Sequence, residues 1–281
     1  MLDPVISRFE DLARADTVAA PLAILTAESL RSVSSGVWQS GVPDLDCACL
    51  HGGKPLLAGT TIAVDSLPAR ELMGNLAALA FSGVSGSAGS AATLPDARAL
   101  LEASINQDGD RLEGLAAESA MDPGLLAALG QLIALPLLQA CGEKAEPVLH
   151  GNVWERGYCP VCAAWPAMAE VRGSERERSL RCGRCGTAWP WPHLKCAFCS
   201  NDDHRTLGYL AADKTREAMQ ATTCDRCHGY LKGVSSLIAM DAGELLLKDL
   251  STLELDAAAA ERGYGRPEAP GFRLDVRVVP V

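Results

Sequence analysis

The chain contains 281 residues, of which 48% are hydrophobic and 21% charged, and its formal net charge is −10. These values are typical of a globular protein that is long enough for two domains. Residues 1–150 carry 8 Lys and Arg against 18 Asp and Glu, whereas residues 151–281 carry 17 of each kind. Because binding to phosphate backbones requires a basic surface, this distribution argues against a nucleic-acid partner.

Residues 1–150 are predicted to form an all-α domain, most simply an irregular helical bundle rich in Ala and Leu. Apolar residues at helical spacing predict one or two helices within residues 1–35 and another over residues 67–81. Residues 36–66 are interpreted as a loop with a short extended piece at TTIAV, and the Gly/Ser-rich residues 82–95 as a mobile surface loop. The stretch MLDPVISRFEDLARAD has no apolar run behind a basic start, so we expect no secretory signal and a cytoplasmic location.

One stretch, from Pro123 to Gly142, contains no charged residue over 20 positions and is long enough to span a membrane. It also contains two glutamines, three glycines and Pro136, and acidic residues lie close to both of its ends. We therefore predict a buried helix that is kinked or interrupted near Pro136, and no membrane insertion.

The composition changes at about residue 150, where Trp, Cys, Arg and short extended runs replace the alanine-rich helices. Eight of the 11 cysteines form four C-x-x-C pairs, which are separated by 19, 10 and 24 residues. The pairs are Cys159 and Cys162, Cys182 and Cys185, Cys196 and Cys199, and Cys224 and Cys227. Because the cytosol keeps thiols reduced, this density of pairs indicates metal binding or catalysis rather than disulfides.

A zinc or iron ion takes four ligands at the corners of a tetrahedron, and two C-x-x-C turns supply four sulfurs with little chain. Gly183 and Gly186 suit the backbone conformations that such turns need. Sequential pairing, first pair with second and third with fourth, is favoured because each intervening segment has hairpin character, with turns at RGSERE and AADKTR. Cross-braced pairing, first with third and second with fourth, is the alternative. Sulfur tetrahedra suit zinc and iron alike.

Other interpretations of the cysteine pairs are weaker. A thioredoxin-type dithiol uses one pair near a βαβ pattern, and iron–sulfur motifs have tighter or less regular runs. Sites with four sulfurs leave no open position for a metal-activated water, so we predict no enzyme activity and assign no catalytic residue.

His193 and His228 lie beside the pairs and are interpreted as surface or supporting residues. Cys47 and Cys49 are interpreted as structural cysteines, and Trp189, Trp191 and Tyr158 are expected to pack over the modules.

The predicted fold class is α+β. A helical domain covers residues 1–150, and two small four-cysteine, zinc-ribbon-like modules cover residues 151–192 and 193–240. Residues 241–281 contain a C-terminal helix over about 245–264 and a tail. The final FRLDVRVVPV is either a short edge strand or a segment that pairs with something else.

Four segments carry a resemblance to a known family: YCPVCAAWP, LRCGRCGTAWPWPHLKCAFC, TCDRCHGYLKGV and KDLSTLELDAAAAERGYGR. Their order and their motifs resemble the formate dehydrogenase accessory protein family, FdhE, over about residues 157–265. The match includes four cysteine pairs in order, the tryptophan after the second pair and the CHxYLK extension. Residues before the first pair match only loosely, as a helical unit.

The resemblance implies a cytoplasmic bacterial accessory protein that is required for active formate dehydrogenase and contacts its catalytic subunit. It implies rubredoxin-like modules in which the eight cysteines bind two iron or zinc ions, with iron favoured. In a second version of this role, one metal site transfers electrons and so keeps a partner's active-site sulfur or selenium reduced. This version requires iron. The alternative function is a zinc ribbon that binds nucleic acid or serves as a general protein-interaction module. Residues 151–240 carry 12 Lys and Arg against 9 Asp and Glu, and two metal–thiolate centres would make this region more negative.

Overall fold

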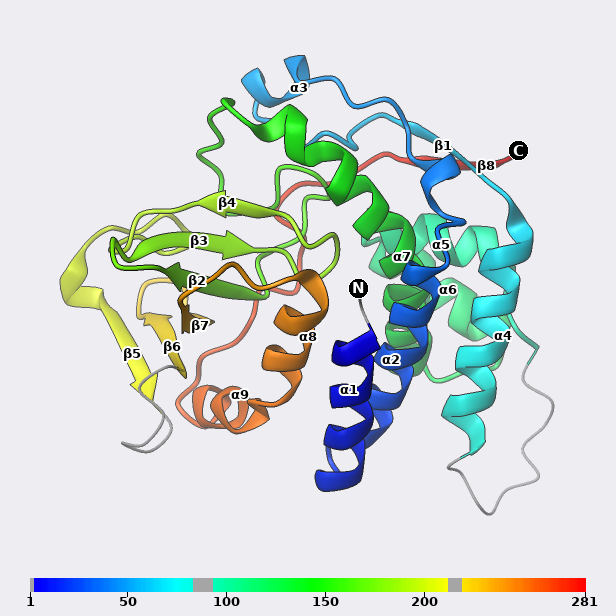
Figure 1. Ribbon diagram of the computed structural model, residues 1–281, viewed down its shortest axis with the longest axis horizontal. Helices are drawn as coiled ribbons and strands as arrows, with labels where there is room; N and C mark the ends of the chain where they lie inside the picture. The colour runs from blue at the N-terminus through cyan, green and yellow to red at the C-terminus, as the bar shows by residue number, and fades with distance from the viewer. Residues whose placement is uncertain (1–2, 83–92, 212–218) are drawn as a thin grey trace. The chain divides into compact units, whose positions relative to one another are not determined.

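The computed structural model describes residues 3–82, 93–211 and 219–281 (Figure 1). The chain divides into two compact units. The first comprises residues 1–45, 57–144 and 273–281, and the second comprises residues 46–56 and 145–272. Both helices and strands are present, which confirms the predicted α+β class.

Helices make up most of the first unit, as the apolar periodicity predicts. Asp96 and Asp108 each begin a helix by accepting a hydrogen bond from the backbone N–H three residues later, at 2.9 and 3.1 Å. The helices are α1 (Asp3–Ala15), α2 (Ala20–Ser34), α4 (Ser66–Ser82), α5 (Ala97–Asn106), α6 (Gly109–Glu118) and α7 (Pro123–Leu149), with a 3-10 turn, η1 (Gln39–Gly41). Most of the Gly/Ser-rich loop predicted at 82–95 lies outside the described residues.

The C-terminal tail forms a strand of the first unit. Strand β8 (Arg277–Pro280) runs parallel to β1 (Thr61–Val64), which lies in the extended piece expected at TTIAV. The side chain of Asn106 fixes the tail, because its Nδ2 donates to the Val276 carbonyl at 2.8 Å and its Oδ1 accepts from the Val276 N–H at 2.9 Å. Of the two alternatives for the tail, the strand is therefore the correct one.

Helix α7 is long and apolar enough to cross a membrane by length and composition, with a mean hydropathy of 1.7 over 18 residues. However, 72% of that window is buried inside the structure, as expected of the core helix that the sequence predicts. Of the two alternatives predicted near Pro136, a kink or an interruption, the interruption is wrong, because the helix continues through this residue to Leu149. Ser29 of α2 donates a hydrogen bond of 2.7 Å to the Leu132 carbonyl, the group that a proline at position 136 leaves unpaired.

The second unit is built on one six-stranded sheet with the strand order β4-β3-β2-β7-β6-β5. Strand β2 runs parallel to β7, and the other neighbours are antiparallel. The strands are β2 (Met168–Arg172), β3 (Glu177–Arg181), β4 (Ala188–Pro190), β5 (Leu207–Ala211), β6 (Met219–Cys224) and β7 (Gly229–Ser236). The unit also contains α3 (Ala48–His51), η2 (His204–Thr206), α8 (Ala242–Leu250) and α9 (Leu253–Ala260).

The sheet contains an internal structural repeat. Each half consists of a cysteine pair, two antiparallel strands, a second cysteine pair and a third strand that pairs with the second. The first hairpin turns between Arg172 and Glu177, where RGSERE predicts it, whereas the turn predicted at AADKTR lies almost wholly outside the described residues. Pairing of β2 with β7 joins the two halves, so the two predicted ribbons share one sheet.

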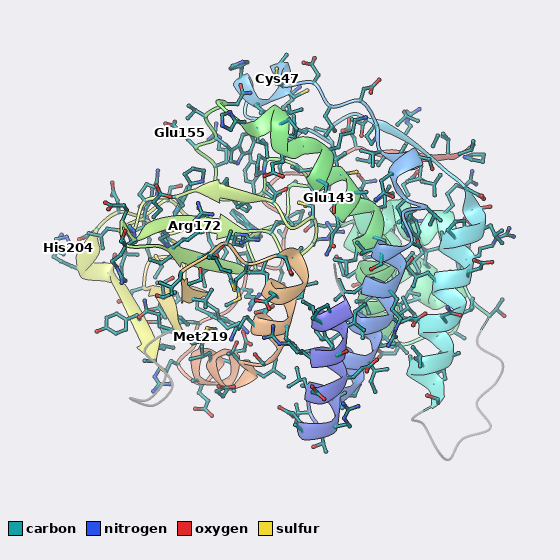
Figure 2. All side chains as sticks on the ribbon, viewed as in Figure 1. Cys47, Glu143, Glu155, Arg172, His204 and Met219 are labelled. Atoms are coloured by element: carbon teal, nitrogen blue, oxygen red, sulfur yellow. The ribbon has the colours of Figure 1, made fainter. Side chains whose placement is uncertain are left out.

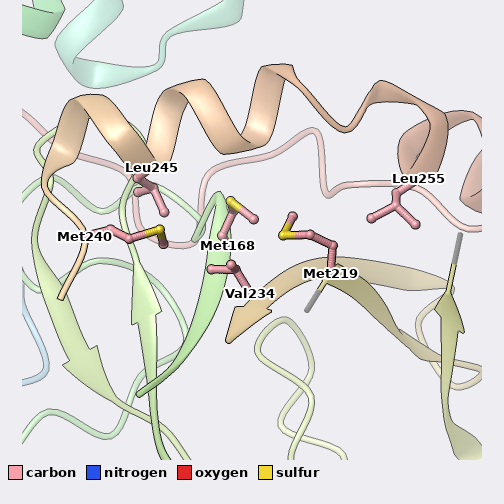
Figure 3. Packing of buried hydrophobic residues seen from close by; sticks show 6 residues of the cluster. All are labelled: Met168, Met219, Val234, Met240, Leu245 and Leu255. Atoms are coloured by element: carbon pink, nitrogen blue, oxygen red, sulfur yellow. The ribbon is translucent and has the colours of Figure 1, made fainter. Parts of the chain in front are cut away.

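Helices α8 and α9 cover one face of this sheet (Figures 1 and 3). The buried side chains between them come from three strands, the segment before α8 and both helices: Met168, Met219, Val234, Met240, Leu245 and Leu255. The sequence predicts one helix over 245–264, but two shorter helices are present. Helix α8 ends before Thr252, which is buried. There the Thr252 hydroxyl donates to the Lys248 carbonyl at 2.8 Å and takes the place of a backbone N–H.

Candidate metal centres

The eight predicted metal-binding cysteines gather into two groups in the second unit. Cluster 1 consists of Cys159, Cys162, Cys182 and Cys185, and cluster 2 consists of Cys196, Cys199, Cys224 and Cys227. Within each cluster the four sulfurs lie within 4.8 Å of one another. The grouping is the sequential one, since the first pair meets the second and the third meets the fourth.

The sulfur separations fit a single ion in each cluster. Between the two cysteine pairs, Sγ–Sγ distances are 3.4 Å in cluster 1 and 3.7 Å in cluster 2. Four sulfurs bound to one zinc ion at about 2.3 Å lie about 3.8 Å apart, whereas a disulfide requires about 2.0 Å. Each cluster can therefore hold one metal ion, with four thiol sulfurs as its donor set.

All four cysteine pairs are followed by a residue in the left-handed backbone region. The residues and their φ angles are Ala163 (61°), Gly186 (75°), Ser200 (58°) and His228 (53°). In the first three turns this residue donates its N–H at 3.1 Å to the carbonyl of the first cysteine of the pair. The left-handed residue turns the chain back toward the two sulfurs, so the four turns share the same backbone conformation at this position.

The expected role of glycine in these turns is correct for Gly186 only. Gly183 has no positive φ, and a Cβ atom there would lie 2.8 Å from the Cβ of Ala167. A side chain at position 183 is therefore excluded by the packing of the turn rather than by its backbone conformation. Gly157 is more tightly confined, because a Cβ there would lie 1.6 Å from the Ala197 carbonyl oxygen, between the two cysteines of the third pair.

Backbone amides point at the sulfurs. In cluster 1 the N–H groups of Val161 and Arg184 donate at 3.4 Å to Cys159 and Cys182. In cluster 2 the side chain of Asn201 donates to Cys224 at 3.5 Å. Such donors stabilise thiolates and place the negative charge of each sulfur toward the centre of the cluster.

The electrostatics of the clusters favour a bound cation. Burial raises the pKa of the Cys159 thiol well above its ordinary value, and the neighbouring thiols raise it further. Burial likewise raises the pKa of Cys196 to about 11. For Cys224 burial acts in the same direction, but the backbone N–H groups of Cys227 and Arg226 outweigh it and lower the pKa to about 7. Because four clustered thiolates repel one another, a metal cation among them supplies the positive charge that their ionisation needs.

The other residues singled out in the sequence lie outside the clusters. The His193 ring lies 2.8 Å from the Arg176 carbonyl, and the His228 ring packs near Tyr264, so neither joins a cluster. Cys47 is exposed beside α3 (Figure 2), Cys49 is half-buried and Cys141 is buried in α7. As expected, Trp189 and Trp191 are buried in the second unit, where their indole N–H groups donate to the carbonyls of Arg156 and Lys195.

A charge network around the buried Lys232 joins β7 to helices α8 and α9 and was not foreseen from the sequence. Lys232 of β7 is fully buried, and its ammonium lies 2.7 Å from carboxylate oxygens of both Asp249 and Asp256. Arg266 contacts the same two carboxylates, at 2.8 and 3.1 Å, and the Tyr230 hydroxyl donates to Asp256 at 2.7 Å. Two cations thus balance two anions. A lysine within an apolar strand, followed by acids on the next helices, is the sequence signal for this network.

Comparisons with known proteins agree with this architecture. The family model "FdhE, C-terminal domain" matches residues 194–271. An FdhE homologue from Stutzerimonas stutzeri is 36% identical over 119 residues, which cover 41% of this chain and 38% of the relative. The FdhE protein of Escherichia coli O127:H6 is 34% identical over 120 residues, covering 42% and 38%, and the homologue from Aquifex aeolicus is 30% identical over 140 residues, covering 47% of each. The chain thus matches less than half the length of these relatives.

A solved structure shares the fold over nearly the whole chain. The crystal structure of the FdhE protein from Pseudomonas aeruginosa matches with a TM-score of 0.56 and 23% sequence identity, over 95% of this chain and 92% of that one. The likeness therefore extends to the helical first unit, where the sequence resemblance is loose. Similarity to FdhE proteins is thus found in the family's C-terminal domain, at residues 194–271, and in a fold shared with one FdhE structure over nearly the whole chain.

Proposed function

We propose that this protein is an accessory factor for the formation of active formate dehydrogenase, and that it binds the catalytic subunit of that enzyme. The observation that carries the proposal is the family domain at residues 194–271, which contains all four cysteines of cluster 2 and the Lys232 network. The role itself comes from the family resemblance of the cysteine segments.

In this proposal the eight clustered cysteines are the metal ligands, and residues 151–192 and 193–240 are the two metal modules. Each module binds one ion through four sulfurs, with iron favoured over zinc by the rubredoxin likeness. The donor sets support this assignment, because tetrahedral sulfur sites suit both metals. Sites with four protein ligands have no open position for substrate, so the protein acts as a non-enzymatic factor. The reduced thiols of such sites fit a cytoplasmic location.

The central experiment deletes the gene for this chain in its host and measures formate dehydrogenase activity and the amount of catalytic subunit. We expect activity to be lost while the subunit is still made, and to return with the wild-type chain. The matched control is Cys47→Ser, since Cys47 is exposed and belongs to neither cluster. The pair Cys196→Ser and Cys199→Ser should fail to restore activity. Full activity in the deletion strain would overturn the proposal.

Partner binding is tested separately, by isolating the tagged chain from its host at low oxygen and analysing proteins and metal in the same sample. The catalytic subunit is expected in the isolate and in the reciprocal isolation. A redox role requires iron, which gives visible charge-transfer bands. Colourless protein that holds only zinc after anaerobic preparation would exclude the redox role and leave the accessory role standing.

A further inference from the structure

The two cysteine clusters differ in their access to solvent. In cluster 1 the four cysteines are between 0% and 3% exposed. In cluster 2, Cys196 and Cys224 are buried, but Cys199 is half-buried and Cys227 is exposed. The two clusters therefore have the same donor atoms and similar turns but differ in the solvent exposure of their cysteines.

A cavity of about 330 Å³ lies against the exposed side of cluster 2. Cys199 and Cys227 line it, together with the aromatic rings of Trp165 and Phe198 and the segment that contains Gly265. A smaller cavity of about 160 Å³ is lined by the other two cysteines of the cluster, Cys196 and Cys224. Each of the four cysteines of cluster 2 therefore lines one of two cavities.

The walls of the larger cavity are held in place by packing. The rings of Trp165 and Phe198 meet edge to face with centroids 5.4 Å apart, and the Trp165 indole N–H donates to the Ala269 carbonyl at 2.8 Å. A Cβ atom at Gly229 would lie 2.5 Å from Phe198 and 3.2 Å from the Cys227 sulfur, so only glycine lets the ring and the sulfur approach. On the other wall, a Cβ atom at Gly265 meets no heavy atom within 4 Å. The larger cavity is therefore bounded by the packed rings of Trp165 and Phe198, and it has free space beside Gly265.

We propose that cluster 2 is the exchange centre of the protein, at which thiols and other small soft-donor ligands reach the metal site through the cavity beside Cys199 and Cys227, whereas cluster 1 is a closed structural centre. The proposal rests on metal binding by both clusters, as put forward above. A metal ion that prefers thiolate ligands is bound well by other soft donors, so such donors compete most readily with the cysteine sulfurs for the ion. Such a ligand has a direct path to cluster 2, but it reaches cluster 1 only after local unfolding.

The test measures metal release from the full-length protein loaded with two ions. With excess chromogenic pyridylazo chelator, or with glutathione present as the probe thiol, release should occur in two phases of one equivalent each. The fast phase should exceed the slow one at least tenfold. Iodoacetamide added during release, followed by peptide mass spectrometry, should label Cys199 and Cys227 before any cysteine of cluster 1. A single phase, or earlier labelling of cluster 1, would overturn the proposal.

A variant tests the route. Gly265→Leu adds a side chain in the free space at the cavity wall and keeps the backbone hydrogen bonds of residue 265, so it should slow the fast phase at least threefold and leave the slow phase unchanged. Gly74→Leu, at an open position of helix α4, is the control and should change neither phase. Equal rates in wild type and Gly265→Leu contradict the route. Protein that binds no metal under any condition would instead refute the metal assignment of the proposed function, so the two failures are distinguishable.

Discussion

The hydroxyl of Ser29 donates a hydrogen bond of 2.7 Å to the carbonyl of Leu132, and this contact explains how an unbroken helix contains Pro136. In an α-helix the carbonyl of residue 132 accepts from the N–H of residue 136, which proline lacks. Ser29 is fully buried, so its hydroxyl makes this bond inside the core. Helix α2 thus supplies the bond that α7 cannot make for itself.

The Ser29→Ala variant should lower the free energy of unfolding by about 1–3 kcal/mol, because it leaves a buried carbonyl without a donor. In a Pro136→Ala background the helix regains its own N–H at residue 136, so the same Ser29→Ala change should cost markedly less. Urea denaturation of the four proteins measures this coupling. Equal costs in both backgrounds would show that the serine acts through something other than the unpaired carbonyl.

The cysteine turns offer a second test, because three of their four left-handed residues are not glycine. Ser200 is exposed and has a φ of 58°, so Ser200→Gly should raise stability by about 1 kcal/mol through relief of backbone strain. Gly186→Ala should do the reverse, since its φ is 75° and the new Cβ would lie 2.8 Å from that of Ala242. Thermal denaturation of the metal-loaded proteins compares the two. A loss of stability in Ser200→Gly would contradict the strain argument.

Paired substitutions separate the two clusters. Changing Cys159 and Cys162 to serine should remove about one equivalent of metal and destabilise the second unit, because folding of such modules is linked to metal binding. Changing Cys196 and Cys199 should remove the other equivalent. Metal analysis together with limited proteolysis records both effects, and Cys47→Ser should retain both ions. Loss of both ions from either pair would mean that the clusters do not bind metal independently.

How far the sequence predicts this architecture depends on the range of the interactions. The cysteine turns are local, and the hairpin at RGSERE closes within a few residues, so spacing and turn residues suffice for both. Pairing of β2 with β7 places Met168 opposite Lys232, and no local pattern encodes a register between strands so far apart in the chain. The continuity of α7 through Pro136 was missed for the same reason, since the compensating donor lies on another helix.

The buried network around Lys232 leads to a prediction for stability and its dependence on pH. Lys232 is fully buried, so removal of the charge of Asp256 leaves it with Asp249 as its remaining carboxylate partner. Asp256→Asn should therefore lower the free energy of unfolding by about 2–4 kcal/mol. The control is Glu261→Gln, at an exposed acid just beyond the end of the same helix, and it should change stability by about 0.5 kcal/mol or less.

The pH dependence follows from the pKa of Asp256. Burial alone would raise that pKa, but hydrogen bonds from Lys232 and Tyr230 outweigh burial and lower it below its ordinary value of 3.8. A carboxyl whose pKa is lowered on folding stabilises the protein above the unfolded pKa, and this contribution is lost as the pH falls through the folded value. The difference in stability between wild type and Asp256→Asn should therefore be constant at neutral and mildly acidic pH and shrink below about pH 4. Urea denaturation across this range measures it, and a difference that grows on acidification would show that Asp256 is not held as a carboxylate by Lys232.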